Sequence, residues 1–203
     1  MGPRQRSPRW QRVALWSVAT VVTLASLYPR PMGINIAAQA VRLSDGKIYF
    51  EAMPRLTDAT ITRQSVSDRN AKYYFELSLP ADAGESLQRL EITQQNGDLF
   101  TREVEFERER SLAFVGQRRS RGEELTISAT LFDQDTHTTT VIFDPPITPG
   151  TDFTLRLRAE RNPRQAGVYL FGVTAYPSGN GVQGQFLGFG RFHIYENDSN
   201  LFR

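Results

Sequence analysis

Alternation of apolar and polar residues with a period of two is the main pattern along the chain after residue 40. Such alternation places one row of side chains on a core and the other in water, which is typical of half-buried strands in antiparallel sheets. Four segments show it. Their predicted core-facing rows are Tyr73, Phe75, Leu77 and Leu79; Val104 and Phe106, in a segment that begins at Phe100; Leu125, Ile127, Ala129 and Leu131; and Phe153, Leu155, Leu157 and Ala159.

Two further strands are predicted near the carboxyl end, on either side of the glycine-rich loop 177–185. Residues 168–176 are largely apolar on both faces, which predicts a central strand. The second strand, 186–195, has two unlike faces. The first face holds Phe186, Gly188, Gly190, Phe192 and Ile194, and the second holds Leu187, Phe189, Arg191, His193 and Tyr195. Glycine inside a strand predicts a bulge, a bend or a neighbouring aromatic ring that lies over the bare backbone.

Turn signals separate these segments at short intervals. They are Asp45-Gly46, Asn96-Gly97, Pro149-Gly150 and Pro177-Ser178-Gly179. Only residues 83–90 could form a helix, and this segment is too short to organise a fold. Roughly nine or ten short strands with almost no helix predict an all-β fold, an antiparallel two-sheet β-sandwich of the immunoglobulin-like or jelly-roll-like kind. We expect residues 41–203 to form this sandwich as a single domain.

The amino-terminal segment has the layout of a secretory signal peptide. A start that contains four arginines precedes fifteen uncharged residues, 13–27, and the segment closes at Ala38-Gln39-Ala40. We therefore expect residues 1–40 to be a signal peptide that is cleaved near Ala40 and uses the general secretion route. The alternative is an uncleaved membrane anchor, because the spacer between Leu27 and Ala40 is long. Spanning a bilayer takes roughly twenty apolar residues, so the short run favours cleavage.

Charge and cysteine content narrow the function classes. The whole chain has a formal charge of +2, but residues 1–40 hold five arginines and no acid. Residues 41–203 therefore hold 19 basic and 22 acidic residues, which give a formal charge of −3. The basic character belongs to the targeting segment, and we expect no nucleic-acid partner. Contact with a membrane is expected only through an uncleaved amino-terminal segment. The absence of cysteine excludes disulfides, thiol nucleophiles and thiolate metal sites.

A basic cluster is the first candidate binding site. Arg118, Arg119 and Arg121 suit an anionic partner such as a lipid headgroup or an acidic polysaccharide. The alternative is a solvated loop, because several glutamates lie close in sequence and mixed charge is typical of such loops.

A polar segment is the second candidate. Asp133, Asp135 and His137 are spaced two apart, so an extended backbone would turn two carboxylates and an imidazole to one side. The alternative is a polar hairpin loop, and the shortage of further ligands counts against a calcium or zinc site. We expect no cofactor.

Aromatic residues near the carboxyl end are the third candidate. Tyr176, Phe189 and Tyr195 would stack on a glycan if they are exposed, with Arg191 to fix its orientation, whereas buried rings, Tyr169 among them, would belong to the core. The glycines beside them do not form a phosphate-binding loop, because that motif needs a helix after it and residues 191–195 continue as a strand. Neither histidine lies in a nucleophile signature, so we expect no enzyme.

The carboxy-terminal half resembles a known family. The runs FDPPITPGTDFTLRLRAERNP, GVYLFGVTAYPSG and FLGFGRFHIY, and more faintly LQRLEITQQNGD and SLAFVG, are similar to an exported cyanobacterial protein family known only as a domain of unknown function. The resemblance implies a signal peptide and a location in the periplasm, the thylakoid lumen or the outer envelope. It implies no catalytic residues.

Three function hypotheses follow. The first is an exported, non-enzymatic interaction or envelope-associated module that binds another protein or a surface polysaccharide. The second is a carbohydrate-binding domain that uses exposed aromatic rings. The third and least favoured is a hydrolase that uses two facing carboxylates.

Overall fold

The computed structural model of this chain describes residues 41–42, 47–95 and 104–196. They fall within one of the two compact units of the chain, residues 36–203. The predicted signal peptide and the turn signals at Asp45-Gly46 and Asn96-Gly97 lie outside the described residues. No helix in the described part is long and apolar enough to cross a membrane.

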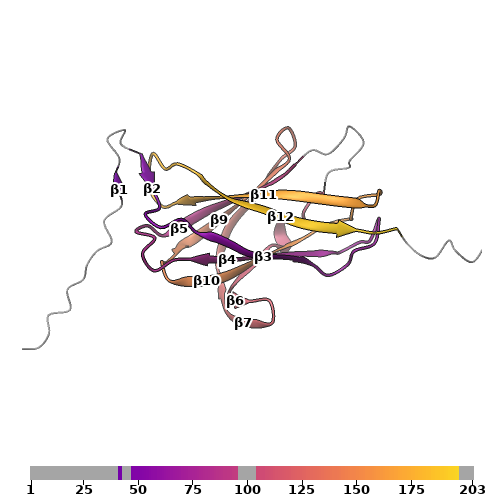
Figure 1. The fold of residues 1–203 in the computed structure, drawn as a ribbon, viewed down its shortest axis with the longest axis horizontal. Helices are drawn as coiled ribbons and strands as arrows, with labels where there is room; N and C mark the ends of the chain where they lie inside the picture. Colours follow the sequence, from indigo (N-terminus) through magenta and orange to yellow (C-terminus); the bar gives the residue numbers. More distant parts are fainter. Residues whose placement is uncertain (1–40, 43–46, 96–103, 197–203) are drawn as a thin grey trace, which may run out of the picture. The chain divides into compact units, whose positions relative to one another are not determined.

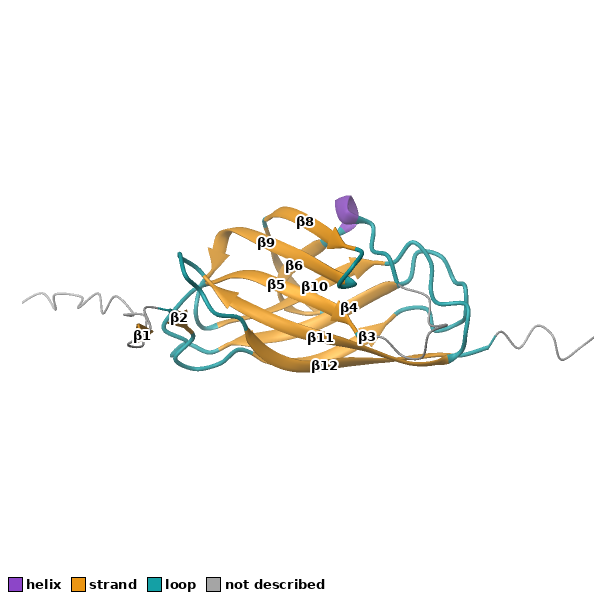
Figure 2. Cartoon of the chain, turned by 90° about the horizontal axis from the view of Figure 1, so that it is seen from above, coloured by secondary structure: helices purple, strands orange, loops and turns teal. Residues whose placement is uncertain are grey.

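Ten of the strands form two antiparallel sheets of five, which confirms the all-β, two-sheet sandwich (Figures 1 and 2). The first sheet has the order β3 (Arg55–Ile61), β4 (Lys72–Leu79), β10 (Thr151–Arg158), β6 (Leu112–Gln117), β7 (Ser120–Leu125). The second sheet has the order β12 (Gln185–Ile194), β11 (Gly167–Pro177), β5 (Leu87–Gln94), β9 (Thr138–Ile147), β8 (Ile127–Asp133). A short pair, β1 (Val41–Arg42) with β2 (Ile48–Tyr49), and one 3-10 turn, η1 (Arg108–Arg110), complete the elements.

The core lies between the two sheets and is rich in aromatic rings. Phe171 of β11 is at its centre, with ring centroids 5.7 Å from Tyr73, 6.4 Å from Phe75, 6.0 Å from Phe106 and 5.5 Å from Phe192. Most of these pairs meet edge to face, the arrangement that the charge distribution of an aromatic ring favours. The strands of both sheets therefore contribute to one continuous core.

Regular strands show the burial that their alternation predicts. The row Tyr73, Phe75, Leu77 and Leu79 is buried in β4, and Phe153, Leu155 and Leu157 are buried in β10. Residues 149–150 form the predicted turn between β9 and β10, with Gly150 at a φ of +82°. Strand β11 lies between β12 and β5, as predicted for a central strand.

Two predictions about strand faces were wrong. The row 125–131 does not share one face, because the chain leaves the first sheet after Leu125, and a register shift between Ile127 and Ala129 turns Leu131 outward, where it is 53% exposed. Phe186 and Leu187 exchange faces in the same way, because the pairing of β12 with β11 shifts beside them. Both departures are effects of β-bulges, which invert the alternation beyond the extra residue.

Two further segments differ from their predicted structure. Val104 and Phe106 are buried as predicted, but their segment is not a strand, and only a single bridge joins Phe106 to Ala159. The segment 83–90 has no helix, since β5 begins at Leu87.

The sandwich is closed along one side, where β3 of the first sheet meets β12 of the second. We call this line the seam. Main-chain hydrogen bonds join its end, from the N–H of Tyr195 to the carbonyl of Gln64 at 2.6 Å and from the N–H of Val66 to the carbonyl of Tyr195 at 2.8 Å. A Cβ added at Gly190 would lie 2.9 Å from Cε1 of Phe75 and 3.1 Å from Cβ of Ala59. Glycine at this position therefore allows β12 to approach the opposite sheet.

We expect Gly190→Ala to lower the free energy of unfolding by about 1–3 kcal/mol, the usual cost of overpacking a core. Urea unfolding, followed by far-UV circular dichroism, measures this change in the free energy of unfolding. Gly167→Ala is the matched control, because its added Cβ would meet only Tyr169, at 3.8 Å. Equal stability of the two variants would contradict a close contact at the seam.

Candidate functional site

The outward row of β12 gathers the candidate aromatic residues on one side of the second sheet. The register shift beside Leu187 places Phe186 on the same side as Phe189, so that both rings project outward. Phe186 is 50% exposed, Phe189 48% and Tyr195 54%. We call this set the β12 outer face; it consists of Phe186, Phe189, Arg191, His193 and Tyr195.

Gly172 of β11 holds two of these rings in position. It pairs with Phe189 across the strands, and its bare backbone lies beneath the rings. A Cβ added there would be 3.2 Å from Phe186 and 3.5 Å from Phe189. The two rings meet edge to face, with centroids 5.0 Å apart. This confirms the prediction that a strand glycine marks a ring lying over the backbone, and it means that the rings are supported from below while they remain half exposed.

Tyr176 has a different environment from the other candidate rings. The guanidinium carbon of Arg89 lies 3.8 Å from its ring centroid, and its hydroxyl donates a 2.6 Å hydrogen bond to Glu91. Partial burial, together with this carboxylate, raises the pKa of Tyr176. A Cβ added at Gly184 would lie 2.5 Å from the ring, so the glycine-rich loop lies against Tyr176. Side chains and loop backbone therefore cover much of this ring.

Tyr169 belongs to the core. It is 4% exposed, and its hydroxyl donates to the carbonyl of Gln165 at 2.9 Å. Burial raises the pKa of its hydroxyl.

The three arginines of the basic cluster have different environments. The backbone N–H of Arg118 donates to Glu76 at 2.9 Å, and its guanidinium lies 5.5 Å from the ring centroid of Tyr74. Arg121 forms a 2.8 Å ion pair with Glu124. Arg119 is exposed at the turn between β6 and β7. Arg118 alone of the three lines a hollow that Arg191 also lines, so the fold brings together two candidate residues that are distant in sequence.

The polar segment 133–137 forms the hairpin turn between β8 and β9. One carboxylate oxygen of Asp133 accepts the backbone N–H groups of Asp135 at 2.9 Å and Thr136 at 3.3 Å, and His137 has a φ of +52°. Hydrogen bonds from the Thr136 side chain and these N–H groups lower the pKa of the Asp133 carboxyl. Among the described residues, no group of three or more acidic, histidine or cysteine side chains could hold a metal ion.

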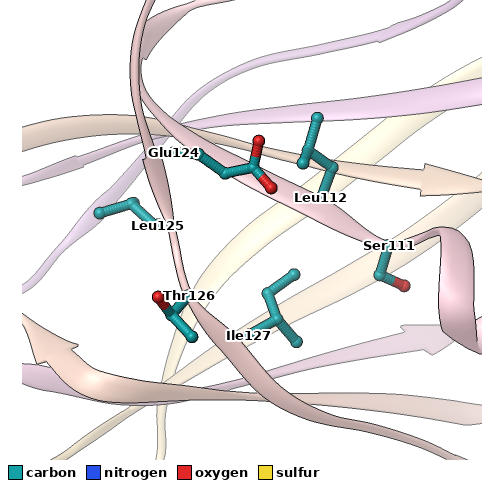
Figure 3. Close-up of a pocket in the computed structure, with 6 residues that line it drawn as sticks. All are labelled: Ser111, Leu112, Glu124, Leu125, Thr126 and Ile127. Carbon is teal, nitrogen blue, oxygen red and sulfur yellow. The ribbon is translucent and has the colours of Figure 1, made fainter.

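Another hollow, of about 420 Å³, lies where the chain passes from β7 to β8 (Figure 3). Its lining has one carboxylate, that of Glu124, and this carboxylate is paired with Arg121. A hollow beside η1 has three glutamates in its lining, but Glu107 is held by ion pairs of 3.0 Å with Arg110 and 3.2 Å with Arg158. Neither lining contains a histidine.

Sequence reasoning overlooked Phe186 as a surface ring and placed Arg118 and Arg191 in separate sites. The bulge that exposes Phe186 could have been suspected from the glycine at position 188, which has a φ of +127°. No local signal could place Arg118 beside Arg191, because the meeting depends on how the two sheets close at the seam.

A family model described as a protein of unknown function, DUF2808, matches residues 47–194, which include every strand from β2 to β12. This confirms the resemblance to a family of unknown function, whereas export and a cyanobacterial origin stay predictions. No curated protein matches the sequence.

Several solved structures are similar in fold. A carboxy-terminal fragment of the major pilin GBS80 of Streptococcus agalactiae has a TM-score of 0.43 at 10% identity and covers 71% of this chain and 56% of its own. A DUF4466 family protein from Parabacteroides merdae has a TM-score of 0.40 at 12% identity, and the match covers 68% of this chain and 45% of that protein. The collagen-binding domain of a Staphylococcus aureus adhesin has a TM-score of 0.33 at 10% identity, and the match covers 63% of this chain and 88% of that domain. The chain thus spans about half the length of the first two, and these scores carry no argument about function.

Proposed function

This chain belongs to the DUF2808 family of proteins of unknown function, and we propose that it is a non-enzymatic, exported binding module that holds its partner on the β12 outer face. The observation that carries the proposal is the alignment of three half-exposed aromatic rings, Phe186 and Phe189 in β12 and Tyr195 directly after it. Large rings gathered on a surface are typical of sites that contact another molecule.

The support beneath the rings strengthens the proposal. Phe186 and Phe189 pack over Gly172 and against each other, so little side-chain freedom remains to be lost on binding. Such preorganisation raises affinity, because ordering a side chain at an interface costs about 0.5–1.5 kcal/mol. A sheet face of this kind suits an extended polymer or a protein surface better than a small molecule, which needs a concave site.

A surface polysaccharide is the partner class that this face fits best. The apolar side of a sugar ring packs well on an aromatic ring. Arg191 lies in sequence between Phe189 and Tyr195, where it can pair with polar groups of the sugar. Tyr176 is covered by Arg89 and packs against the loop 177–185, so we assign it to support of this loop and not to contact with the sugar. The basic first segment and apolar run of residues 1–40 support export by the general secretion route to the periplasm, the thylakoid lumen or the outer envelope.

We expect the double variant Phe186→Ala, Phe189→Ala to weaken binding of the purified protein to cell-envelope polysaccharide about ten-fold, because two stacking rings are lost. Affinity electrophoresis in gels that contain the polysaccharide fraction measures the change. Leu131→Ala is the matched control, since Leu131 is an apolar side chain of the same sheet with similar exposure, 53%, on the distant strand β8. Undiminished binding by the double variant would overturn the proposed face.

A protein partner at the free edge of β8 is the second candidate. The second sheet ends at β8, and residues 127–132, Ile-Ser-Ala-Thr-Leu-Phe, contain no charge, proline or glycine. Natural edge strands are usually protected by such residues, so an edge that lacks them favours pairing with another strand, although η1 lies beside part of β8. Loss of partner binding in Leu131→Ala, with the ring variant unaffected, would favour this edge over the β12 outer face.

A further inference from the structure

A hollow of about 310 Å³ lies at the seam, beside the β12 outer face. Three parts of the chain line it: β3 and the residues after it, the turn between β6 and β7, and β12. We call it the seam pocket; its polar lining residues are Thr60, Gln64, Arg118, Arg191 and His193. The rest of the lining is apolar.

The seam pocket has a positive lining. It combines two guanidinium groups with an imidazole, and its lining includes no carboxylate. Glu76 and Asp58, the acids of the adjoining strands, lie outside the lining, and Glu76 accepts the backbone N–H of Arg118 rather than its guanidinium. Cations on a partly enclosed surface that lacks acids attract an anion strongly.

The cationic groups of the seam pocket are available to a ligand. Within the described part of the chain, the guanidinium of Arg191 forms no hydrogen bond or ion pair, and that of Arg118 only faces the ring of Tyr74 at 5.5 Å. The hydroxyl of Thr60 is buried and has no hydrogen-bond partner among the described residues. Because this hydroxyl is buried, we expect the contacts to a ligand to come from the two guanidinium groups and not from Thr60.

We propose that the seam pocket binds an anionic oxygen group of a sugar, a sulfate ester or a carboxylate, and that the partner of this protein is an acidic polysaccharide. The inference rests on the proposed function, because the sugar chain would lie along the β12 outer face. Arg191 and His193 occupy the same outward row as Phe189 and Tyr195, so the rings and the pocket adjoin. Guanidinium groups pair well with such oxyanions, since they donate two parallel hydrogen bonds.

Net charge favours spaced anionic groups over an extended anionic surface. Residues 41–203 carry a formal charge of −3, so an extended anionic surface repels the domain as a whole, and physiological salt screens this repulsion only beyond about 8 Å. A local pair of guanidinium groups still binds a single anion that enters the seam pocket.

The test measures binding of the purified protein to dextran sulfate, to polygalacturonate and to unmodified dextran by isothermal titration calorimetry. We expect one or both acidic polymers to bind more tightly than dextran, and Arg118→Gln and Arg191→Gln each to weaken that binding about ten-fold, the effect of one lost charged contact. Arg119→Gln is the matched control, because Arg119 follows Arg118 in the same turn but does not line the pocket. Its binding should stay within about two-fold of the parent protein.

Four outcomes decide the inference. Selective loss in the two lining variants supports it, and the polymer that binds identifies sulfate or carboxylate as the anion. An equal loss of affinity in Arg119→Gln would mean that binding rests on general charge attraction, and it would overturn the inference. Saturation by inorganic phosphate, with no gain from any polymer, would assign the pocket to a free anion and overturn it. Binding that depends on Phe189 but not on Arg118 or Arg191 would overturn this inference and leave the proposed function standing.

Discussion

Phe171→Ala is expected to lower the free energy of unfolding by about 3–5 kcal/mol, the usual cost of truncating a buried phenylalanine. Phe171 is 1% exposed and contacts rings of both sheets, so its loss would leave a cavity that neighbouring strands cannot fill. Since domains of this size are stable by about 5–15 kcal/mol, the variant should retain little stability. Equilibrium unfolding in urea measures the change.

Phe189→Ala is the matched control for Phe171→Ala. It makes the same chemical change on the neighbouring strand, but at a ring that is 48% exposed. We expect a loss below about 1 kcal/mol, as is usual for surface substitutions. This control also shows whether the Phe189 part of the double variant, for which a binding defect is predicted, leaves folding intact. Similar losses in the two variants would mean that Phe171 is not the centre of the core.

Asn162→Ala is expected to cost about 2–4 kcal/mol, because it leaves the buried hydroxyl of Tyr73 without its acceptor and removes two part-buried hydrogen bonds. Asn162 is 2% exposed, and its side chain joins three segments. Its Oδ1 accepts the hydroxyl of Tyr73 at 2.9 Å, and its Nδ2 donates to the carbonyls of Arg63 at 2.9 Å and Ser65 at 3.1 Å. The substitution removes the acceptor of the Tyr73 hydroxyl and the side-chain donor to Arg63, whereas the carbonyl of Ser65 keeps the backbone N–H of Asp68 at 3.3 Å. Burial already raises the pKa of Tyr73 well above its usual range.

A double-mutant cycle with Tyr73→Phe separates the contributions of Asn162. Tyr73→Phe alone should cost about 1–2 kcal/mol, and the double variant should cost less than the sum of the single variants, because the two side chains share one hydrogen bond. Asn180→Ala, at an exposed asparagine of the loop 177–185, serves as the surface control. Full additivity would contradict the bond between Tyr73 and Asn162.

Regular alternation was sufficient to predict the uninterrupted strands. Strand β4 buries Tyr73 and Leu77 as expected, since residues two apart in a strand always share a face. The same rule failed at Leu131 and Phe186, where a bulge inverts the faces. Phe106 was placed in the core correctly but not in a strand, because it is buried against Tyr73, 5.3 Å away, and not by pairing along a sheet.

The candidate sites depended more strongly on the tertiary structure. Composition identified the arginines and the aromatic residues, but sequence spacing could not tell that Arg118 would share a pocket with Arg191 while Arg121 paired with Glu124. Nor could it tell that Arg89 would cover Tyr176. The meeting of Arg118 with Arg191 and that of Arg89 with Tyr176 join parts of the chain that are distant in sequence, and strand order is not encoded in any one strand.

The sequence by itself determined the all-β class, the two-sheet architecture and the regular core rows, because these follow from side-chain alternation within each strand and from turn residues between strands. Only the tertiary structure decided where the alternation breaks and which polar residues meet. The physical reason is that bulges depend on pairing between strands, and that the seam forms where glycine at position 190 lets β12 approach Ala59 of the opposite sheet.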